Sequence, residues 1–238
     1  MIVLLSASGL SRAQSPDRVP VIAELFTSEG CSSCPPADDL LQMWLQEQPI
    51  KGVYIVPLSE HVTYWDHQGW KDPFSAQQFT ARQQQYGQRF NLDSIYTPQL
   101  IVDGTREFVG SDKRAIERAL TDAAKTPKPA LQVAVTTADG SLKITASGAG
   151  LTAETNAELI FAVTEDHLVI DVPRGENAKR TLKHSGVVRW LSSGGETGSA
   201  TATVKIAPDW HRENLRVVAF VQSRKTRRVI SAAFADAH

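Results

Sequence analysis

Cysteine is scarce in this chain, and its scarcity narrows the chemistry more than any other feature. The 238 residues contain two cysteines, Cys31 and Cys34, separated by two residues. A disulfide framework that staples a small secreted domain needs several pairs and is excluded. A structural zinc site needs four ligands, and neither a second cysteine pair nor a histidine cluster is present to supply them. The pair therefore points to one local dithiol or disulfide.

Neither a charge excess nor a long apolar run is present. The chain has 25 Lys and Arg against 26 Asp and Glu, so its formal net charge of −1 gives no general attraction for nucleic acid or anionic membranes. The densest basic run, residues 224–228, lies between apolar stretches and predicts a solvated hairpin turn, because a nucleic-acid site needs a wider footprint. No apolar run reaches the length that spans a bilayer. We therefore expect no nucleic-acid partner and no integral membrane span.

The first residues predict export. A short, mostly apolar stretch runs from Ile2 to Leu10, and Ser11-Arg12-Ala13 places small residues where a signal-peptide cleavage site needs them. The basic region that usually opens a signal peptide is missing. We interpret residues 1–18 as a signal-peptide remnant and leader, with a disordered N-terminus as the alternative. Export would place the protein in the periplasm or outside the cell, where a disulfide can persist.

Residues 19–126 alternate between predicted strands and helices. Two short apolar runs, residues 19–26 and 53–58, are typical of buried strands, and a helix that opens with Pro35 lies between them. Short links between a strand, a helix and a strand favour a parallel pair. A second helix is expected after Asp72-Pro73, followed by two strands around the Asp103-Gly104 turn and a last helix beginning near Ser111.

A proline-rich segment, residues 125–129, marks the predicted domain boundary. Beyond it the apolar runs are short, rich in β-branched residues and separated by turn signals: 131–135, 142–144, 159–163, 204–206, 217–221 and 229–230. This pattern is typical of an antiparallel sandwich of about a hundred residues. A polar cluster at residues 174–189 is expected to fix one domain against the other, with a ligand site as the alternative.

The cysteine pair lies between a predicted strand and a predicted helix. Two intervening residues let the sulfurs approach bonding distance, and the free amides of the helix start favour thiolate over thiol. This predicts Cys31 as the attacking thiol of a thiol–disulfide exchange and Cys34 as the resolving thiol. A structural disulfide is the alternative, although so short a loop removes only about 2 kcal/mol of unfolded-state entropy. A copper site using Cys31, Cys34 and His61 is a third hypothesis.

Two further segments are candidates for the same place. The Thr97-Pro98 bond can be cis at modest cost, which would leave the Thr97 backbone free to pair with an extended substrate; an ordinary proline at the start of a strand is an equal alternative. The loop after the second strand should flank the cysteines, because exit loops of parallel strands gather at one sheet edge. It carries the candidate substrate-binding residues, for which simple packing is the alternative: Glu60, His61, Tyr64, Trp65 and Trp70.

Four segments together carry a likeness to a known family: ELFTSEGCSSCPPAD, SEHVTYWDHQGWKDPF, YTPQLIVDG and RGENAKRTLKHSGVVR. They resemble the exported bacterial thioredoxin-like family catalogued as domain of unknown function 1223 (DUF1223), over roughly residues 20–236. The resemblance implies an α/β thioredoxin-like domain at residues 19–126, followed by an antiparallel β-sandwich-like domain at residues 127–238. It implies a location outside the cytoplasm and brings no defined substrate.

The resemblance to thioredoxins also implies roles for individual residues. Cys31 matches the exposed nucleophile, Cys34 its buried partner and Pro98 the cis-proline, with Thr97 before it. Thioredoxins often hold a buried acid six residues before the first cysteine, where it helps to remove the proton of the resolving thiol. Glu24 is the candidate here, although it lies seven residues ahead; a half-buried glutamate facing solvent is the alternative.

Two departures from the thioredoxin pattern concern the cysteine loop. Gly30 rather than tryptophan precedes Cys31, and Pro35 follows Cys34 directly, so the helix could begin later and stabilise the thiolate less. We predict an extracytoplasmic thiol–disulfide oxidoreductase acting on protein thiols or disulfides, without a cofactor or a resident metal. The alternatives are a non-catalytic binding or scaffold protein with an inert disulfide, and a copper-handling protein.

Overall fold

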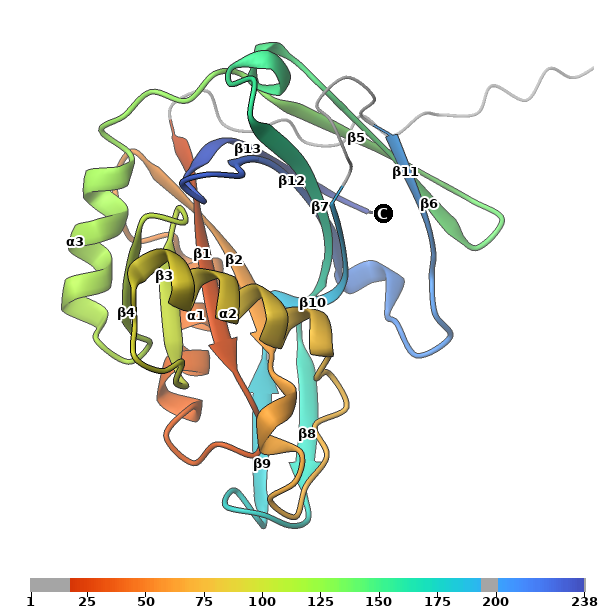
Figure 1. Ribbon diagram of the computed structural model, residues 1–238. Helices are drawn as coiled ribbons and strands as arrows, with labels where there is room; N and C mark the ends of the chain where they lie inside the picture. The colour runs from red at the N-terminus through yellow and green to blue at the C-terminus, as the bar shows by residue number, and fades with distance from the viewer. Residues whose placement is uncertain (1–17, 194–200, 238) are drawn as a thin grey trace, which may run out of the picture.

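The computed structural model describes residues 18–193 and 201–237 (Figure 1). The predicted signal-peptide remnant therefore lies, apart from Arg18, outside the described residues. Of the described residues, 41% are in strands and 23% in helices. No helix among them is long and apolar enough to cross a membrane.

One mixed sheet of eight strands forms the centre of the molecule, in the order β13-β12-β7-β10-β2-β1-β3-β4. Its strands are β1 (Val19–Thr27), β2 (Val53–His61), β3 (Gln99–Val102), β4 (Arg106–Val109), β7 (Ala157–Glu165), β10 (Val187–Ser193), β12 (Leu215–Ser223) and β13 (Val229–Asp236). β1 and β2 are parallel along their whole length, as expected. β10 joins β2 in parallel at Val187 and Ser59, and the other pairs are antiparallel.

The continuous sheet corrects the predicted fold class. The expected α/β thioredoxin-like domain followed by an antiparallel β-sandwich-like domain is wrong, because strands from both parts of the chain share one sheet. The junction is β10 on β2, where the Ser59 amide donates to the Gly186 carbonyl at 2.7 Å. Apolar runs mark where strands form, but they do not specify which strand pairs with the open edge of β2. The boundary at residues 125–129 stays a prediction.

Three helices cover the β1–β2 part of the sheet on both faces (Figure 1). Successive side chains of β1 point to opposite faces. Val21, Ala23 and Leu25 pack with α1 (Pro35–Glu47) and α3 (Lys113–Ala123), whereas Ile22 and Phe26 pack on the face that carries α2 (Gln77–Phe90). Which face a residue of β1 occupies therefore decides whether it can reach the start of α1.

Two smaller sheets complete the fold of the described residues. β5 (Gln132–Ala138), β6 (Ser141–Ser147) and β11 (Thr201–Lys205) form a three-stranded sheet that packs on β7, β12 and β13 around a common apolar cluster. β8 (Leu168–Val172) and β9 (Arg180–His184) form a hairpin that extends beside the start of α1, at the bottom of Figure 1. We call residues 168–184 the β8–β9 arm. Three short 3₁₀ helices lie at η1 (Thr63–Trp65), η2 (Ala149–Thr152) and η3 (Arg212–Asn214).

Candidate functional site

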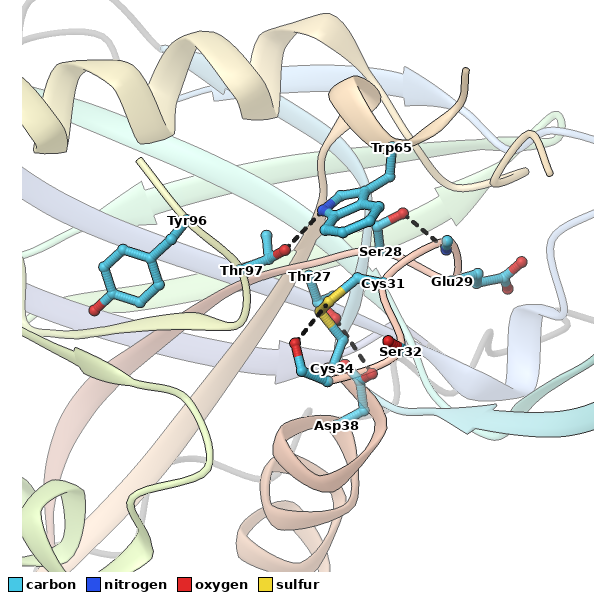
Figure 2. Close-up of a disulfide and its surroundings, with 12 residues drawn as sticks. Thr27, Ser28, Glu29, Cys31, Ser32, Cys34, Asp38, Trp65, Tyr96 and Thr97 are labelled. Carbon is cyan, nitrogen blue, oxygen red and sulfur yellow. Dashed lines mark hydrogen bonds between the residues drawn. A yellow bond between two sulfur atoms is a disulfide. The ribbon is translucent and has the colours of Figure 1, made fainter. Parts of the chain in front are cut away.

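The cysteine pair lies in the loop from β1 to α1 (Figure 2). Cys31 and Cys34 form a disulfide, with their Cα atoms 5.4 Å apart. Cys34 is the N-cap residue of α1, and its carbonyl accepts the amide of Ala37 at 2.8 Å. The predicted placement of the pair, between a strand and a helix, is confirmed.

The first turn of α1 differs from the expectation in one respect that matters for the thiolate. The helix begins at Pro35, so the proline does not delay it. Pro35 and Pro36 have no amide N–H, however, and the amides of Ala37 and Asp38 both donate to the carbonyl of Cys34. The first turn of α1 therefore does not offer Cys31 the free amides that sequence reasoning relied on.

Both sulfurs are inside the molecule. Cys31 and Cys34 are 0% exposed, whereas the two serines between them are exposed. The expectation that Cys31 would be the exposed nucleophile is therefore wrong for this state of the protein. Trp65 packs over the loop: its Cβ lies 3.0 Å from where a Cβ on Gly30 would be, and its indole donates to Thr97 Oγ1 at 2.7 Å (Figure 2).

The Thr97-Pro98 peptide is cis and lies beside the cysteine loop. Gly110 is packed between Pro98 and α1, since a Cβ there would lie 3.0 Å from Pro98 Cβ and 2.9 Å from Ala37 Cβ. The cis alternative of the sequence analysis is thus confirmed. Whether Thr97 pairs with a substrate stays a prediction.

The β8–β9 arm holds the cysteine loop from the other side. The side chain of Asn177 is buried and donates to the carbonyls of Glu29 and Cys31, at 2.8 and 2.9 Å. Glu176 Oε2 accepts the amide of Ser32 at 3.1 Å. The polar cluster at residues 174–189 therefore fixes a later segment of the chain to the loop. That it fixes one domain against another stays a prediction. It also contributes to the burial of Cys31.

A buried carboxylate lies one turn after Cys34. Asp38 follows Cys34 by four residues, so the two side chains lie on the same face of α1. Thr27 Oγ1 donates to Asp38 Oδ2 at 3.2 Å, and Oδ1 has no hydrogen-bond partner among the described residues (Figure 2). Burial raises the pKa of Asp38 to about 7, against the opposing effect of His184. A cavity of about 140 Å³ between α1 and β9 is lined by Asp38 and His184.

Sequence reasoning missed Asp38 as a functional candidate. The four-residue spacing from Cys34 was the available signal, because it places a carboxylate next to the second cysteine whenever a helix starts there.

The structure places Glu24 away from the disulfide. Glu24 is fully buried on the α2 face of the sheet, where it accepts from Arg82 Nε and Tyr86 Oη, both at 2.6 Å. Thr27, which contacts Asp38, lies on the opposite face. Glu24 is thus neither a solvent-facing strand residue nor a neighbour of the cysteine pair.

Glu60 belongs to the same buried cluster as Glu24. Its Oε1 lies 3.4 Å from Arg82 Nε, and neither carboxylate oxygen has a hydrogen-bond partner among the described residues. Burial raises the pKa of Glu60 well above its usual range. Arg82 also donates to Gln222 Oε1 of β12 at 3.1 Å, so this cluster ties α2 to the sheet rather than lining the cysteine site.

His61 does reach the cysteine loop, through Asp72. His61 Nδ1 lies 2.6 Å from Asp72 Oδ2, and the same oxygen accepts the amide of Glu29 at 2.8 Å. Burial opposes both charges, but their mutual attraction outweighs it, so the pKa of His61 is raised and that of Asp72 is lowered. From the sequence, Asp72 is predicted only to mark the start of a helix.

Trp70 and His184 contact different carboxylate oxygens of Glu29. Trp70 Nε1 donates to Glu29 Oε2 at 2.6 Å, and His184 Nε2 lies 3.4 Å from Glu29 Oε1. The rings of His61 and His184 are 5.0 Å apart. Tyr64 is half-buried and donates to Gln83 of α2 at 3.2 Å. Of the five predicted loop residues, the structure therefore brings His61, Trp65 and Trp70 to the cysteine loop, but neither Glu60 nor Tyr64 makes a described hydrogen bond to it.

The copper hypothesis finds no ligand set. Across residues 18–193 and 201–237, no group of three or more His, Cys, Asp or Glu side chains is arranged to hold a metal ion. Cys31 and Cys34 are bonded to each other, and Asp72 occupies Nδ1 of His61.

Comparison with known proteins gives a family and a fold. Residues 22–222 match the family model described as "Protein of unknown function (DUF1223)". The search of curated proteins found no match for this chain. The crystal structure of protein AGR_C_4864 from Agrobacterium tumefaciens is similar at 23% identity and a TM-score of 0.71, over 94% of this chain and 97% of that one.

A second similar structure is HBP35 of Porphyromonas gingivalis. It is 14% identical, with a TM-score of 0.58, over 94% of this chain and 76% of that one. At such identities these likenesses show the fold alone.

Proposed function

The chain belongs to the DUF1223 family, and we propose that it is a thiol–disulfide exchange protein, acting outside the cytoplasm through Cys31 and Cys34. The observation that carries the proposal is the pairing of this disulfide with a buried carboxyl, Asp38, one turn behind Cys34. A bridge across so short a loop stabilises a fold by only about 2 kcal/mol, which is a weak reason to keep it. A group that exchanges a proton near neutral pH is what a reversibly leaving sulfur requires.

The structure holds the oxidised form of the cysteine pair, and this form can oxidise a substrate dithiol. A substrate thiolate attacks Cys31 Sγ, the Cys31–Cys34 bond breaks, and Cys34 leaves as a thiolate that takes the proton of Asp38. The second substrate thiol, once deprotonated by solvent, attacks the mixed disulfide and releases the Cys31 thiolate. Two electrons pass from the substrate to the cysteine pair. In the reverse direction the dithiol protein reduces a substrate disulfide, and Asp38 takes the proton of Cys34.

Access to Cys31 requires a local opening. Four hydrogen bonds hold Trp65 and the β8–β9 arm over the cysteine loop. Trp65 donates to Thr97, the Ser32 amide donates to Glu176, and Asn177 donates two. Each such bond contributes about 0.5–1.5 kcal/mol net, so opening costs roughly 2–6 kcal/mol, which is within the range of local unfolding. A partner that displaces the β8–β9 arm would reach Cys31 beside the Thr97 backbone.

Burial of the pair favours a second candidate, a binding or scaffold protein with an inert disulfide. A redox titration against glutathione separates the two functions. Reduction within the range of the glutathione pool, with Cys31 alkylated before Cys34, supports exchange. A bridge that resists this pool and stays oxidised supports the scaffold.

Trapping of a mixed disulfide tests the exchange directly. The Cys34→Ala variant, incubated with a disulfide-bonded peptide, is expected to accumulate an adduct through Cys31 that dithiothreitol releases. The matched Cys31→Ala variant should trap little adduct. Cys34 would then have to act as the first nucleophile, and in the proposed mechanism it attacks only the disulfide formed by Cys31. Equal trapping by both variants, or none by either, would count against the exchange function.

A further inference from the structure

A cleft of about 780 Å³ lies between α2, the strands β7 and β10, and the turn from β12 to β13. This volume is within the range of ligand sites. α2 begins next to the end of β2, where the Ala76 amide donates to the His61 carbonyl, and it ends beside the turn, where Arg89 Nε donates to the Thr226 carbonyl. The basic wall of the cleft is therefore at the end of α2 remote from the cysteine loop.

Positive charge is concentrated in this cleft. Its lining includes Arg89, Arg224, Lys225 and Arg227, against the single carboxylate of Glu158. Glu158 is shared, at 3.7 Å from Arg224 and 3.3 Å from Arg227. Within the described ranges of the chain, neither Arg89 nor Lys225 has an acidic partner. This excess stands out in a protein whose formal net charge is −1.

The fold holds these cations together although they repel one another. The carbonyl of Arg227 accepts from Gln222 Nε2 at 2.6 Å and lies 1.8 Å from where a Cβ on Gly104 would be. The Val229 amide donates to the Asp103 carbonyl at 2.9 Å. Because the turn is anchored by its backbone, the charges cannot separate by moving it. A bound anion would relieve the repulsion.

We propose that the cleft binds an acidic peptide segment, independently of the redox function. Guanidinium groups pair with carboxylates through two parallel hydrogen bonds. The exposed amides of Gln78, Gln85 and Gln88 both donate and accept, as peptide groups require. The half-buried Leu191 offers an apolar surface for an aliphatic side chain. None of the described lining residues is aromatic, so the cleft lacks the stacking platform of single-stranded nucleic-acid sites.

Titration calorimetry of the full chain with an acetylated Glu-Glu-Leu-Glu-Glu peptide tests the proposal. The double variant Arg224→Glu/Lys225→Glu should bind the peptide roughly tenfold more weakly or worse, since both attractions become repulsions. The matched variant Arg114→Glu/Arg118→Glu changes the net charge equally on the exposed surface of α3 and should bind like the wild type. Added salt should weaken wild-type binding.

Three results would overturn the proposal. The first is equal peptide binding by the turn variant and the α3 variant. The second is binding of citrate or inorganic phosphate as tightly as the peptide, which would assign the cleft to small anions. The third is tighter binding of oligothymidylate. If the turn variant fails to fold, Gln88→Glu on the exposed face of α2 adds a repelling charge without removing any contact of the turn, and it should weaken peptide binding.

Discussion

Replacing Asp38 by asparagine should stabilise the folded protein, and its advantage over the wild type in the free energy of unfolding should grow as the pH rises. The pKa of this carboxyl is raised from 3.8 to about 7 by burial. Between these values the folded protein keeps a proton that the unfolded chain has lost, so wild-type stability falls as the pH rises through this window. Each unit of the difference is worth about 1.4 kcal/mol, which gives roughly 4 kcal/mol above pH 7. An asparagine at this position would not ionise, and Thr27 could still donate to its amide oxygen.

Urea unfolding of the oxidised protein at several pH values measures this effect. The free energy of unfolding of Asp38→Asn should exceed that of the wild type by an amount that grows by roughly 3 kcal/mol between pH 5 and pH 8. Asp39→Asn is the matched control, because it makes the same change at the next, exposed position of α1. A difference between Asp38→Asn and the wild type that stays constant from pH 5 to pH 8 would refute the account of Asp38.

The same variant should lose activity while it gains stability. Asparagine cannot exchange the Cys34 proton, so the mixed disulfide of the reduced variant should persist roughly a hundredfold longer at pH 7. The lifetime can be followed by quenching with acid and separating the adduct. Opposite signs for stability and turnover distinguish a lost proton acceptor from general damage to the fold.

Three further changes probe the surroundings of the pair. Asn177→Ala removes the hydrogen bond from Arg180 within the arm and both hydrogen bonds to the cysteine loop. The two bonds to the loop are worth about 1–3 kcal/mol, so the change should speed reduction of the disulfide by dithiothreitol roughly 5- to 150-fold. Glu24→Gln leaves Arg82 poorly paired and should cost about 3 kcal/mol in urea unfolding, without slowing resolution of the mixed disulfide. For His61→Gln, the loss of stability relative to the wild type should shrink as the pH rises from 6.5, the ordinary pKa of histidine, through the raised pKa of His61, because the ion pair with Asp72 is lost across this window. That loss is measured by urea unfolding across the same pH range.

Each of these three predictions has a result that would contradict it. Thr181→Ala is the control for Asn177→Ala, since it removes an exposed bond to Asp171 within the β8–β9 arm and leaves the cysteine loop untouched; equal acceleration by both would mean that the arm does not act through Asn177. Slower resolution of the mixed disulfide in Glu24→Gln would show that Glu24, after all, accepts the proton of Cys34. A stability loss in the histidine variant that is independent of pH would show that the ion pair contributes little.

Local features of the site follow from the sequence because their causes are local. A β-branched run, two prolines at a helix start and a two-residue spacing place the disulfide between β1 and α1. The rule for exit loops correctly brings Trp65 and His61 to the same edge. The six β-rich runs of the second half likewise fall on or beside the strands β5, β6, β7, β11, β12 and β13.

What the sequence does not predict depends on pairing over long distances and on a single step of register. Nothing local states that β10 adds to β2 or that Asn177 covers Cys31, because these contacts join residues more than a hundred positions apart. The face of the sheet on which Glu24 lies depends on whether an odd or an even number of residues separates it from Cys31. Seven rather than six residues before Cys31 moves a side chain to the other face of a strand, and the structure places the acid on α1 instead.

The junction of β10 with β2 makes the two halves of the chain dependent on each other. In a fragment that ends at the proline-rich segment, β2 would become an edge strand with unpaired amide and carbonyl groups. Strands from other copies of the fragment could pair with it. It would also strip Asn177 and Glu176 from the cysteine loop. Fragments of the chain should therefore aggregate, and their cysteine pair should react without selectivity. Any selectivity in thiol–disulfide exchange would require the full-length chain.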